Sequence, residues 1–184
     1  MEVFIRMFNH LIVIVFIVLI PVTTFSQPLR PYAVYDGEKL TIGYDIGVDS
    51  SERMHNWFKD EGGDFVMNYP DGQTWGAVFI TVGNPNSSPQ ERQFKNFSNF
   101  NTLIISMKGA NGGEKVDIGI KDRTNPDDGS EIKKTVTLTN TYSEYRFALK
   151  DFSTVDIQNL YVVTEFVFGN NSPCRIFVNS IKFQ

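Results

Sequence analysis

An acidic run between two apolar segments is the first place where this sequence could carry chemistry. Residues 121–131 (KDRTNPDDGSE) contain three aspartates, one glutamate and one asparagine. Calcium takes about six to eight oxygen ligands, which side chains at alternating loop positions can supply. The same residues are also ordinary turn chemistry, and Arg123 and Pro126 interrupt the usual calcium-loop pattern. We interpret the run as a turn in preference to a calcium loop, with Asp122 placed to face a ligand across a sheet rim.

Catalytic residues are scarce. The only histidines are His10 and His55, so a Ser-His-Asp arrangement would have to use one of them, and no G-x-S-x-G motif accompanies it. A retaining glycosidase needs two carboxyl groups about 5–5.5 Å apart. Glu114, Asp117 and Glu165 lie on or beside expected strands, but no strand carries a run of the E-x-D-x-E type. The sequence therefore predicts a protein that is not an enzyme, with a glycoside hydrolase or lyase less favoured.

Three aromatic residues in polar, turn-rich segments are the main candidates for a binding role. Sugars present flat C–H faces that stack on indole and phenol rings, and polar neighbours bind the hydroxyl groups. Tyr69 and Trp75 flank a Pro-Asp-Gly turn and fit a core position as well as a ligand position. Trp57 lies in a polar stretch, which favours the rim of a site. We expect these three rings to be partly exposed.

The elements that must position these residues are strands, because hydrophobicity alternates with a period of two. Turn signals rich in Gly, Pro, Asn and Asp separate the apolar runs. The pattern predicts an all-β fold, a two-sheet β-sandwich of the jelly-roll kind. The longest connection, residues 83–101, is polar and is either functional or a surface crossover. The expected strands are residues 39–46, 64–69, 75–82, 103–108, 116–121, 135–139, 145–150, 160–168 and 175–183.

The first 26 residues have the pattern of a secretory signal peptide. Arg6 precedes an apolar run at residues 11–20, and small residues follow before Gln27. The run is about half of the ~20 residues that a membrane span needs, which favours cleavage over an uncleaved anchor. We therefore expect residues 27–184 to form one domain that is secreted, extracellular or periplasmic, with no membrane association after cleavage. The single cysteine, Cys174, excludes an internal disulfide.

Charge and composition narrow the class of partner. The formal net charge of the 184-residue chain is −4, and no basic run of the kind that grips phosphate occurs. Nucleic-acid binding needs a basic face, so a nucleic-acid partner is not expected.

Several phrases resemble carbohydrate-binding modules with a galactose-binding-domain-like jelly roll. They include VYDGE, YPDGQTWGAVFI, EYRFALKDF and IFVNSIKF, and the resemblance covers nearly all of residues 33–183. It implies a non-catalytic module that binds polysaccharide or oligosaccharide along a concave sheet face. It also implies a structural Ca²⁺ between the first and last strands, with Asp36, Glu38 and Asn179 at the matching positions. Asn179 stands where such modules often have an acidic residue.

Two functional classes follow, and we favour the first. The first is a secreted polysaccharide-binding module, and the second is an extracellular structural or adhesive protein that uses the same sandwich and self-associates through an edge strand. Aromatic stacking residues on one face distinguish the first class. The predicted ligand-binding residues are Trp57, Tyr69, Trp75, Asp117, Lys121, Asp122, Arg146, Tyr161 and Glu165.

Overall fold

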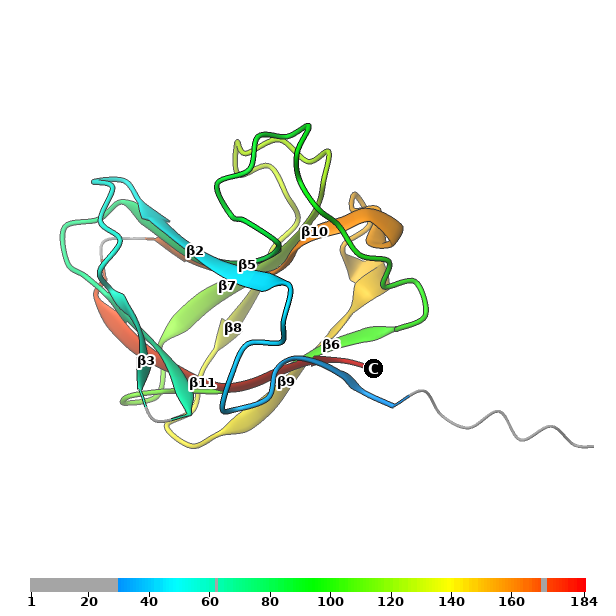
Figure 1. Cartoon of the computed structure of the whole chain (residues 1–184). Helices are drawn as coiled ribbons and strands as arrows, with labels where there is room; N and C mark the ends of the chain where they lie inside the picture. Colours follow the sequence, from blue (N-terminus) through cyan, green and yellow to red (C-terminus); the bar gives the residue numbers. More distant parts are fainter. Residues whose placement is uncertain (1–29, 62, 170–171) are drawn as a thin grey trace, which may run out of the picture.

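The computed structural model describes residues 30–61, 63–169 and 172–184, which form two antiparallel sheets packed face to face (Figure 1). This confirms the predicted all-β sandwich. The predicted signal peptide, residues 1–26, lies outside the described residues. No helix in the described part of the chain is long and apolar enough to cross a membrane.

The first sheet has the strand order β3-β4-β11-β6-β9, with β1 paired to β11. Its long central strand, β11, pairs with β4 on one side and β6 on the other. The strands are β1 (Tyr32–Tyr35), β3 (Phe58–Glu61), β4 (Asp64–Tyr69), β6 (Thr102–Gly109), β9 (Ser143–Ala148) and β11 (Cys174–Phe183).

The second sheet has the order β2-β5-β10-β7-β8 and forms the upper layer in Figure 1. Two single-turn 3-10 helices, Leu149–Asp151 and Ile157–Asn159, lie between β9 and β10. The strands are β2 (Tyr44–Ser50), β5 (Trp75–Val82), β7 (Lys115–Asp122), β8 (Lys134–Thr137) and β10 (Leu160–Gly169).

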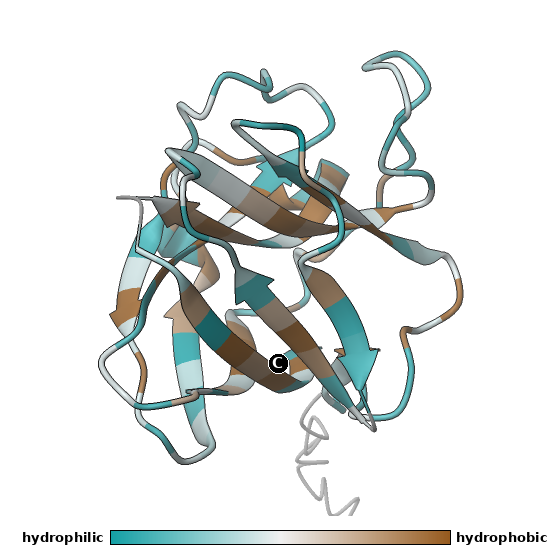
Figure 2. Ribbon diagram, turned by 90° about the vertical axis from the view of Figure 1, so that its left-hand side faces the viewer, coloured by the Kyte–Doolittle hydropathy of each residue, from teal (hydrophilic) through white to brown (hydrophobic). Residues whose placement is uncertain are grey.

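The core lies between the two sheets and is built from the inward half of each strand. On β5, Val78, Ile80 and Val82 are buried, and on β11 Ile176 and Val178 are buried. Figure 2 shows the resulting alternation of hydrophobic and hydrophilic bands along the strands. Burial of a large aliphatic side chain contributes about 1.5–3 kcal/mol, so this double layer stabilises a domain without any disulfide.

Three elements differ from the sequence-based prediction. The strand expected at residues 39–46 begins later, at Tyr44, because the chain turns at residues 41–43 and Gly43 has a φ of +92°. The short strands β1 and β3 are additional. Both extend the first sheet, and β3 has the exposure pattern of an edge strand.

Candidate functional site

The outer face of the second sheet carries a row of side chains that crosses all five strands. The strand register aligns Asp49, Ala77, Val167, Asp117 and Thr135, in that order from β2 to β8. Two carboxylates therefore flank an apolar floor made by Ala77 and Val167. Thr135 donates its hydroxyl hydrogen bond to Asp117, which fixes that carboxylate. We call these five residues the central row.

Trp75 stands beside the central row at the start of β5. It is two positions before Ala77, so both side chains project from the same face of the sheet. Its indole is 44% exposed, the largest exposed fraction of any aromatic side chain in the described residues. The residue opposite Trp75 on β10 is Gly169, which has no side chain to cover the ring.

Phe79 follows Ala77 by two residues on β5, so it projects from the same face, and its ring lies over the backbone of β2. Gly47 is directly opposite on β2, and a Cβ built there would lie 2.2 Å from the Phe79 ring. The glycine is therefore required for the ring to lie flat on the sheet. Phe79 adds a half-buried aromatic surface between the central row and the far end of the face.

A buried ionic cluster lies level with Phe79 on the neighbouring strands. The Glu165 side chain lies over Gly119, where a Cβ would be only 2.3 Å from its Oε1. Lys121 Nζ lies 3.5 Å from Glu165 Oε2 and 3.4 Å from Glu131 Oε2. Lys133 Nζ lies 2.5 Å from Glu131 Oε1. Two lysines and two glutamates thus form one largely buried ionic cluster.

The two glutamates differ in their protonation. Glu165 is only 3% exposed, and this burial raises its pKa to about 7, with the neighbouring Glu131 adding to the rise. Burial is the largest single influence on Glu131 and acts in the same direction, but the hydrogen bonds that Glu131 accepts, first of all from Lys133, and the charge of Lys121 together outweigh it and lower the pKa of Glu131 below the ordinary value. The pair therefore keeps one proton, on Glu165, up to near-neutral pH.

We expect Glu165→Gln to flatten the dependence of stability on pH between about pH 5 and pH 8. In the unfolded chain Glu165 ionises near pH 4.3 (an approximate ordinary value), whereas in the folded protein it keeps its proton to about 7. The stability contributed by the protonated form is full below the unfolded pKa and is lost as the pH rises through the folded pKa. Urea unfolding at several pH values measures the slope.

The matched control is Glu144→Gln on the first sheet. Hydrogen bonding from Lys182 lowers the pKa of Glu144, so its titration lies below this pH range and its variant should keep the wild-type slope. Equal slopes for wild type and Glu165→Gln would contradict the assignment of the proton to Glu165.

Two loops rise together over one end of this face and form a wall (Figure 1). The wall comprises residues 83–94 and 122–131. Arg92 joins them, because it donates to the backbone oxygen of Asn125 at 3.1 Å and pairs with Asp127. Its guanidinium also lies 4.8 Å from the centre of the Tyr161 ring. The acidic run singled out in the sequence is therefore one side of a fixed wall.

The structure brings five of the predicted ligand residues to this outer face. They are on three neighbouring strands, so the strand neighbours that the sequence could not establish are now known. Tyr161 is only 3% exposed, because Arg92 covers its ring, and Glu165 is buried as described above. The five residues are Trp75, Asp117, Lys121, Tyr161 and Glu165.

The expectation that Trp57 and Tyr69 are partly exposed is wrong. Their exposed fractions are 3% and 2%, and both belong to the core. Trp57 packs edge-on against Tyr69 and Phe168, with ring centroids 5.6 Å and 5.4 Å away. The polar residues around Trp57 in the sequence lie on the surface while its indole closes the end of the sandwich. These rings offer no face to a ligand.

Asp122 and Arg146 are also placed differently from the prediction. Asp122 is 4% exposed, and its carboxylate accepts backbone hydrogen bonds from Thr124 and Asp156, so it holds the wall and does not face a ligand. Arg146 projects from β9 of the first sheet, where it pairs with Glu144. It therefore lies on the opposite side of the sandwich from the central row.

The segments that carry the residues predicted to hold calcium, Asp36, Glu38 and Asn179, lie side by side. β1 pairs with β11, and a Cβ at Gly37 would lie 3.0 Å from the backbone oxygen of Asn179. Asp36 Oδ1 already accepts hydrogen bonds from the backbone nitrogens of Glu38 and Lys39. No group of three or more His, Cys, Asp or Glu side chains that could hold a metal occurs among the described residues. Calcium binding stays a prediction.

Several residues of this face were missing from the sequence-based set, among them Asp49, Phe79 and Glu131. Phe79 lies within the strand predicted at residues 75–82, so its place two residues after Ala77 was a usable signal, whereas Asp49 lies beyond the strand predicted at residues 39–46. Glu131 lies in the acidic run but reaches the sheet only because the wall folds back over Lys121. No pattern in the neighbouring sequence indicates that this loop folds back onto the sheet.

A two-sheet sandwich that presents an open aromatic ring beside carboxylates is typical of a carbohydrate-binding module. Residues 34–184 match the family model of Carbohydrate binding domain 30, and the chain belongs to this family. A comparison with curated proteins finds no match.

Solved structures of related modules share the fold. The family 30 carbohydrate-binding module of the cellulosomal cellulase Cel9D-Cel44B of Clostridium thermocellum is 17% identical, with a TM-score of 0.59, and the match covers 85% of this chain and 98% of that chain. A mutant of the family 29 module CBM29-2 complexed with mannohexaose is 18% identical, with a TM-score of 0.55 over 84% of this chain and 90% of that chain. A second mutant, complexed with cellulohexaose, is 18% identical with a TM-score of 0.54.

Proposed function

We propose that this module binds a linear hexose polysaccharide along the outer face of the second sheet. The observation that carries the proposal is the open indole of Trp75, 44% exposed, beside the central row. Its ring is the stacking surface for one sugar. The floor formed by Ala77 and Val167 is low enough for the polymer to continue across the strands.

The carboxylates of the central row supply the polar half of recognition. Asp49 and Asp117 are both partly exposed, and ionised carboxylates accept hydrogen bonds from hydroxyl groups more strongly than neutral acceptors do. Five strands about 4.8 Å apart give a face about 19 Å wide. That width accommodates several consecutive sugar residues, and the loop wall limits the face at one end.

The related complexes support the choice of polymer. Two mutants of CBM29-2 have solved structures in complex with mannohexaose and with cellulohexaose, and we propose that the ligand of this chain is of the same kind, a glucan or mannan. We further propose that the protein acts outside the cytoplasm after removal of residues 1–26, which agrees with the extracellular substrates of such modules.

Trp75→Ala tests the proposed function. We expect it to weaken binding of cellohexaose or mannohexaose at least tenfold, about 1.4 kcal/mol, because the stacking surface is lost. The melting temperature should change little, since the ring is largely outside the core. Isothermal titration calorimetry with each hexaose, beside a thermal melt, measures both quantities.

Tyr142→Ala is the matched control, because this ring is also exposed, at 38%, but lies against Lys108 of the first sheet. It should leave hexaose binding unchanged. Unchanged binding in Trp75→Ala would overturn the proposed site. A wild-type protein that binds neither hexaose but self-associates would instead favour the structural or adhesive alternative.

A further inference from the structure

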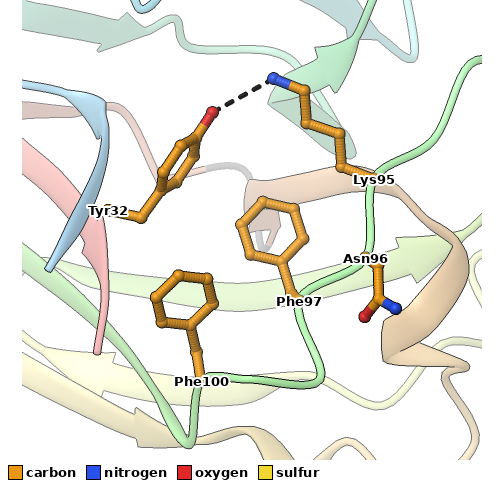
Figure 3. Close-up of a pocket in the computed structure, with 5 residues that line it drawn as sticks. All are labelled: Tyr32, Lys95, Asn96, Phe97 and Phe100. Carbon is orange, nitrogen blue, oxygen red and sulfur yellow. Dashed lines mark hydrogen bonds between the residues drawn. The ribbon is translucent and has the colours of Figure 1, made fainter. Parts of the chain in front are cut away.

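A pocket lies at the end of the sandwich that is opposite to Trp75. It has a volume of about 370 Å³ and is lined by Tyr32, Lys95, Asn96, Phe97 and Phe100. Figure 3 shows the three aromatic rings together, with the Lys95 amine extended toward the Tyr32 hydroxyl and the Asn96 side chain turned away. Ligand pockets typically begin at about 300 Å³, so this one is large enough for a single small ligand.

The pocket is separate from the proposed polysaccharide face. Lys95 lies over the ring of Tyr44 at 4.3 Å from its centre, and Tyr44 pairs with Val82 at the end of β5. Trp75 is at the start of the same strand, seven residue steps away, or about 23 Å. One short ligand cannot occupy both places.

Lys95 is a cation without an anionic partner. None of the salt bridges among the described residues involves it. Its Nζ donates to the Tyr32 hydroxyl at 3.1 Å and lies near two aromatic rings. An ammonium group has three donors, so the capacity to bind an anion remains. A half-buried charge gains most from a partner that also enters the pocket.

The Tyr32 hydroxyl supplies a second donor. It accepts a hydrogen bond from the Tyr44 hydroxyl at 3.0 Å as well as the one from Lys95. A hydroxyl accepts about two hydrogen bonds and donates one, so its own proton is left for a ligand. A carboxylate has two oxygens and matches this pair of donors.

The aromatic rings indicate which kind of molecule the carboxylate belongs to. The Tyr32 ring lies 5.8 Å from that of Phe97 and 6.1 Å from that of Phe100, centre to centre. Tyr32 and Phe100 are partly exposed, whereas Phe97 is buried at 1%. Exposed ring faces stack on the C–H faces of a sugar. We infer that this pocket binds a uronate, a sugar ring that bears a carboxylate, with Lys95 and Tyr32 holding the carboxylate and Phe100 stacking on the ring.

A repeated phrase in the sequence provides an internal control for this site. Residues 95–98 (KNFS) and 150–153 (KDFS) are similar, and Phe97 and Phe152 are both 1% exposed. Lys150 lines a neighbouring pocket that shares Phe100, but its side chain is solvent-exposed and it has no aromatic neighbour among the described ring contacts. The two lysines thus have similar sequence surroundings and different environments.

The test is a ¹H–¹⁵N NMR titration of the protein with D-glucuronate and D-galacturonate. At least one uronate should give saturable shifts of the Lys95, Phe97 and Phe100 amides, while D-glucose and D-galactose should bind at least tenfold more weakly. Lys95→Gln should weaken uronate binding at least tenfold and Lys150→Gln should not. Trp75→Ala should leave uronate binding intact, so failure of the proposed polysaccharide face would be distinguishable from failure of this inference.

Other outcomes would overturn the inference. They are the absence of saturable shifts with both uronates, an equal response to acetate, or equal losses in Lys95→Gln and Lys150→Gln. If Lys95→Gln does not fold, Tyr32→Phe replaces it, because this variant keeps the ring and removes only the hydroxyl. It should weaken uronate binding several-fold, and unchanged binding would count against the inference.

Discussion

Trp57→Ala is expected to lower the free energy of unfolding by about 3–5 kcal/mol, as truncation of a buried aromatic residue does. The Trp57 indole is 3% exposed, and its Nε1 donates to the backbone oxygen of Met54 at 3.0 Å. Its ring packs edge-on against Phe168 with an interplanar angle of 89°. Truncation removes this packing and leaves a cavity between the two sheets.

Urea unfolding followed by far-ultraviolet circular dichroism measures this loss. Trp75→Ala is the control, because it removes the same side chain from an exposed position and should cost much less stability. If the two variants lose equal stability, the assignment of Trp57 to the core and Trp75 to the surface would be wrong. If Trp57→Ala does not fold, Trp57→Phe should still show a reduced melting temperature.

Gly47→Ala is expected to cost about 1–3 kcal/mol, the usual range for overpacking. The new methyl group would lie 2.2 Å from the Phe79 ring, so the ring must leave its place on β2. Backbone strain is not the cause, because Gly47 is not among the glycines with positive φ. The aromatic side-chain NMR signals of Phe79 should shift, and hexaose binding should weaken if the ring supports the central row.

Gly169→Ala is the matched control, since it is also a strand glycine of the second sheet without positive φ. The nearest atom to a Cβ there is the backbone oxygen of Thr74 at 3.9 Å. Its unfolding free energy should stay within about 0.5 kcal/mol of wild type. A similar loss in both variants would show that the cost is a general effect of replacing strand glycines.

The alternation of apolar and polar residues predicts the strands at the centre of both sheets well. A strand with one buried face needs a period of two, and β7 shows it, because Val116, Ile118 and Ile120 are buried while Asp117 and Lys121 are partly exposed. The pattern does not reveal β3, because three of its four residues are exposed. That strand exists through its backbone pairing with β4, which no side-chain pattern records.

The candidate site is less predictable, because alternation fixes which residues share a face within one strand but not which sheet the strand joins. Arg146 and Asp117 both alternate with apolar neighbours, yet β9 and β7 belong to different sheets. Trp57 shows a related limit. Its ring partners, Tyr69 and Phe168, are distant in the chain, so its polar sequence neighbours give the wrong indication of its surroundings.

The pairing of β1 with β11 has a consequence for how the domain can be rebuilt. Tyr32 is the register partner of Phe183, so the start of the first strand lies beside the end of the last strand of the domain (Figure 1). A short peptide can join them, and the chain can be reopened at the exposed turn of residues 111–113 to give a circular permutant with the same strand pairs. Because these two ends are close together, the domain also suits insertion into a surface loop of a host protein. The host strands on either side of that loop would not have to move apart.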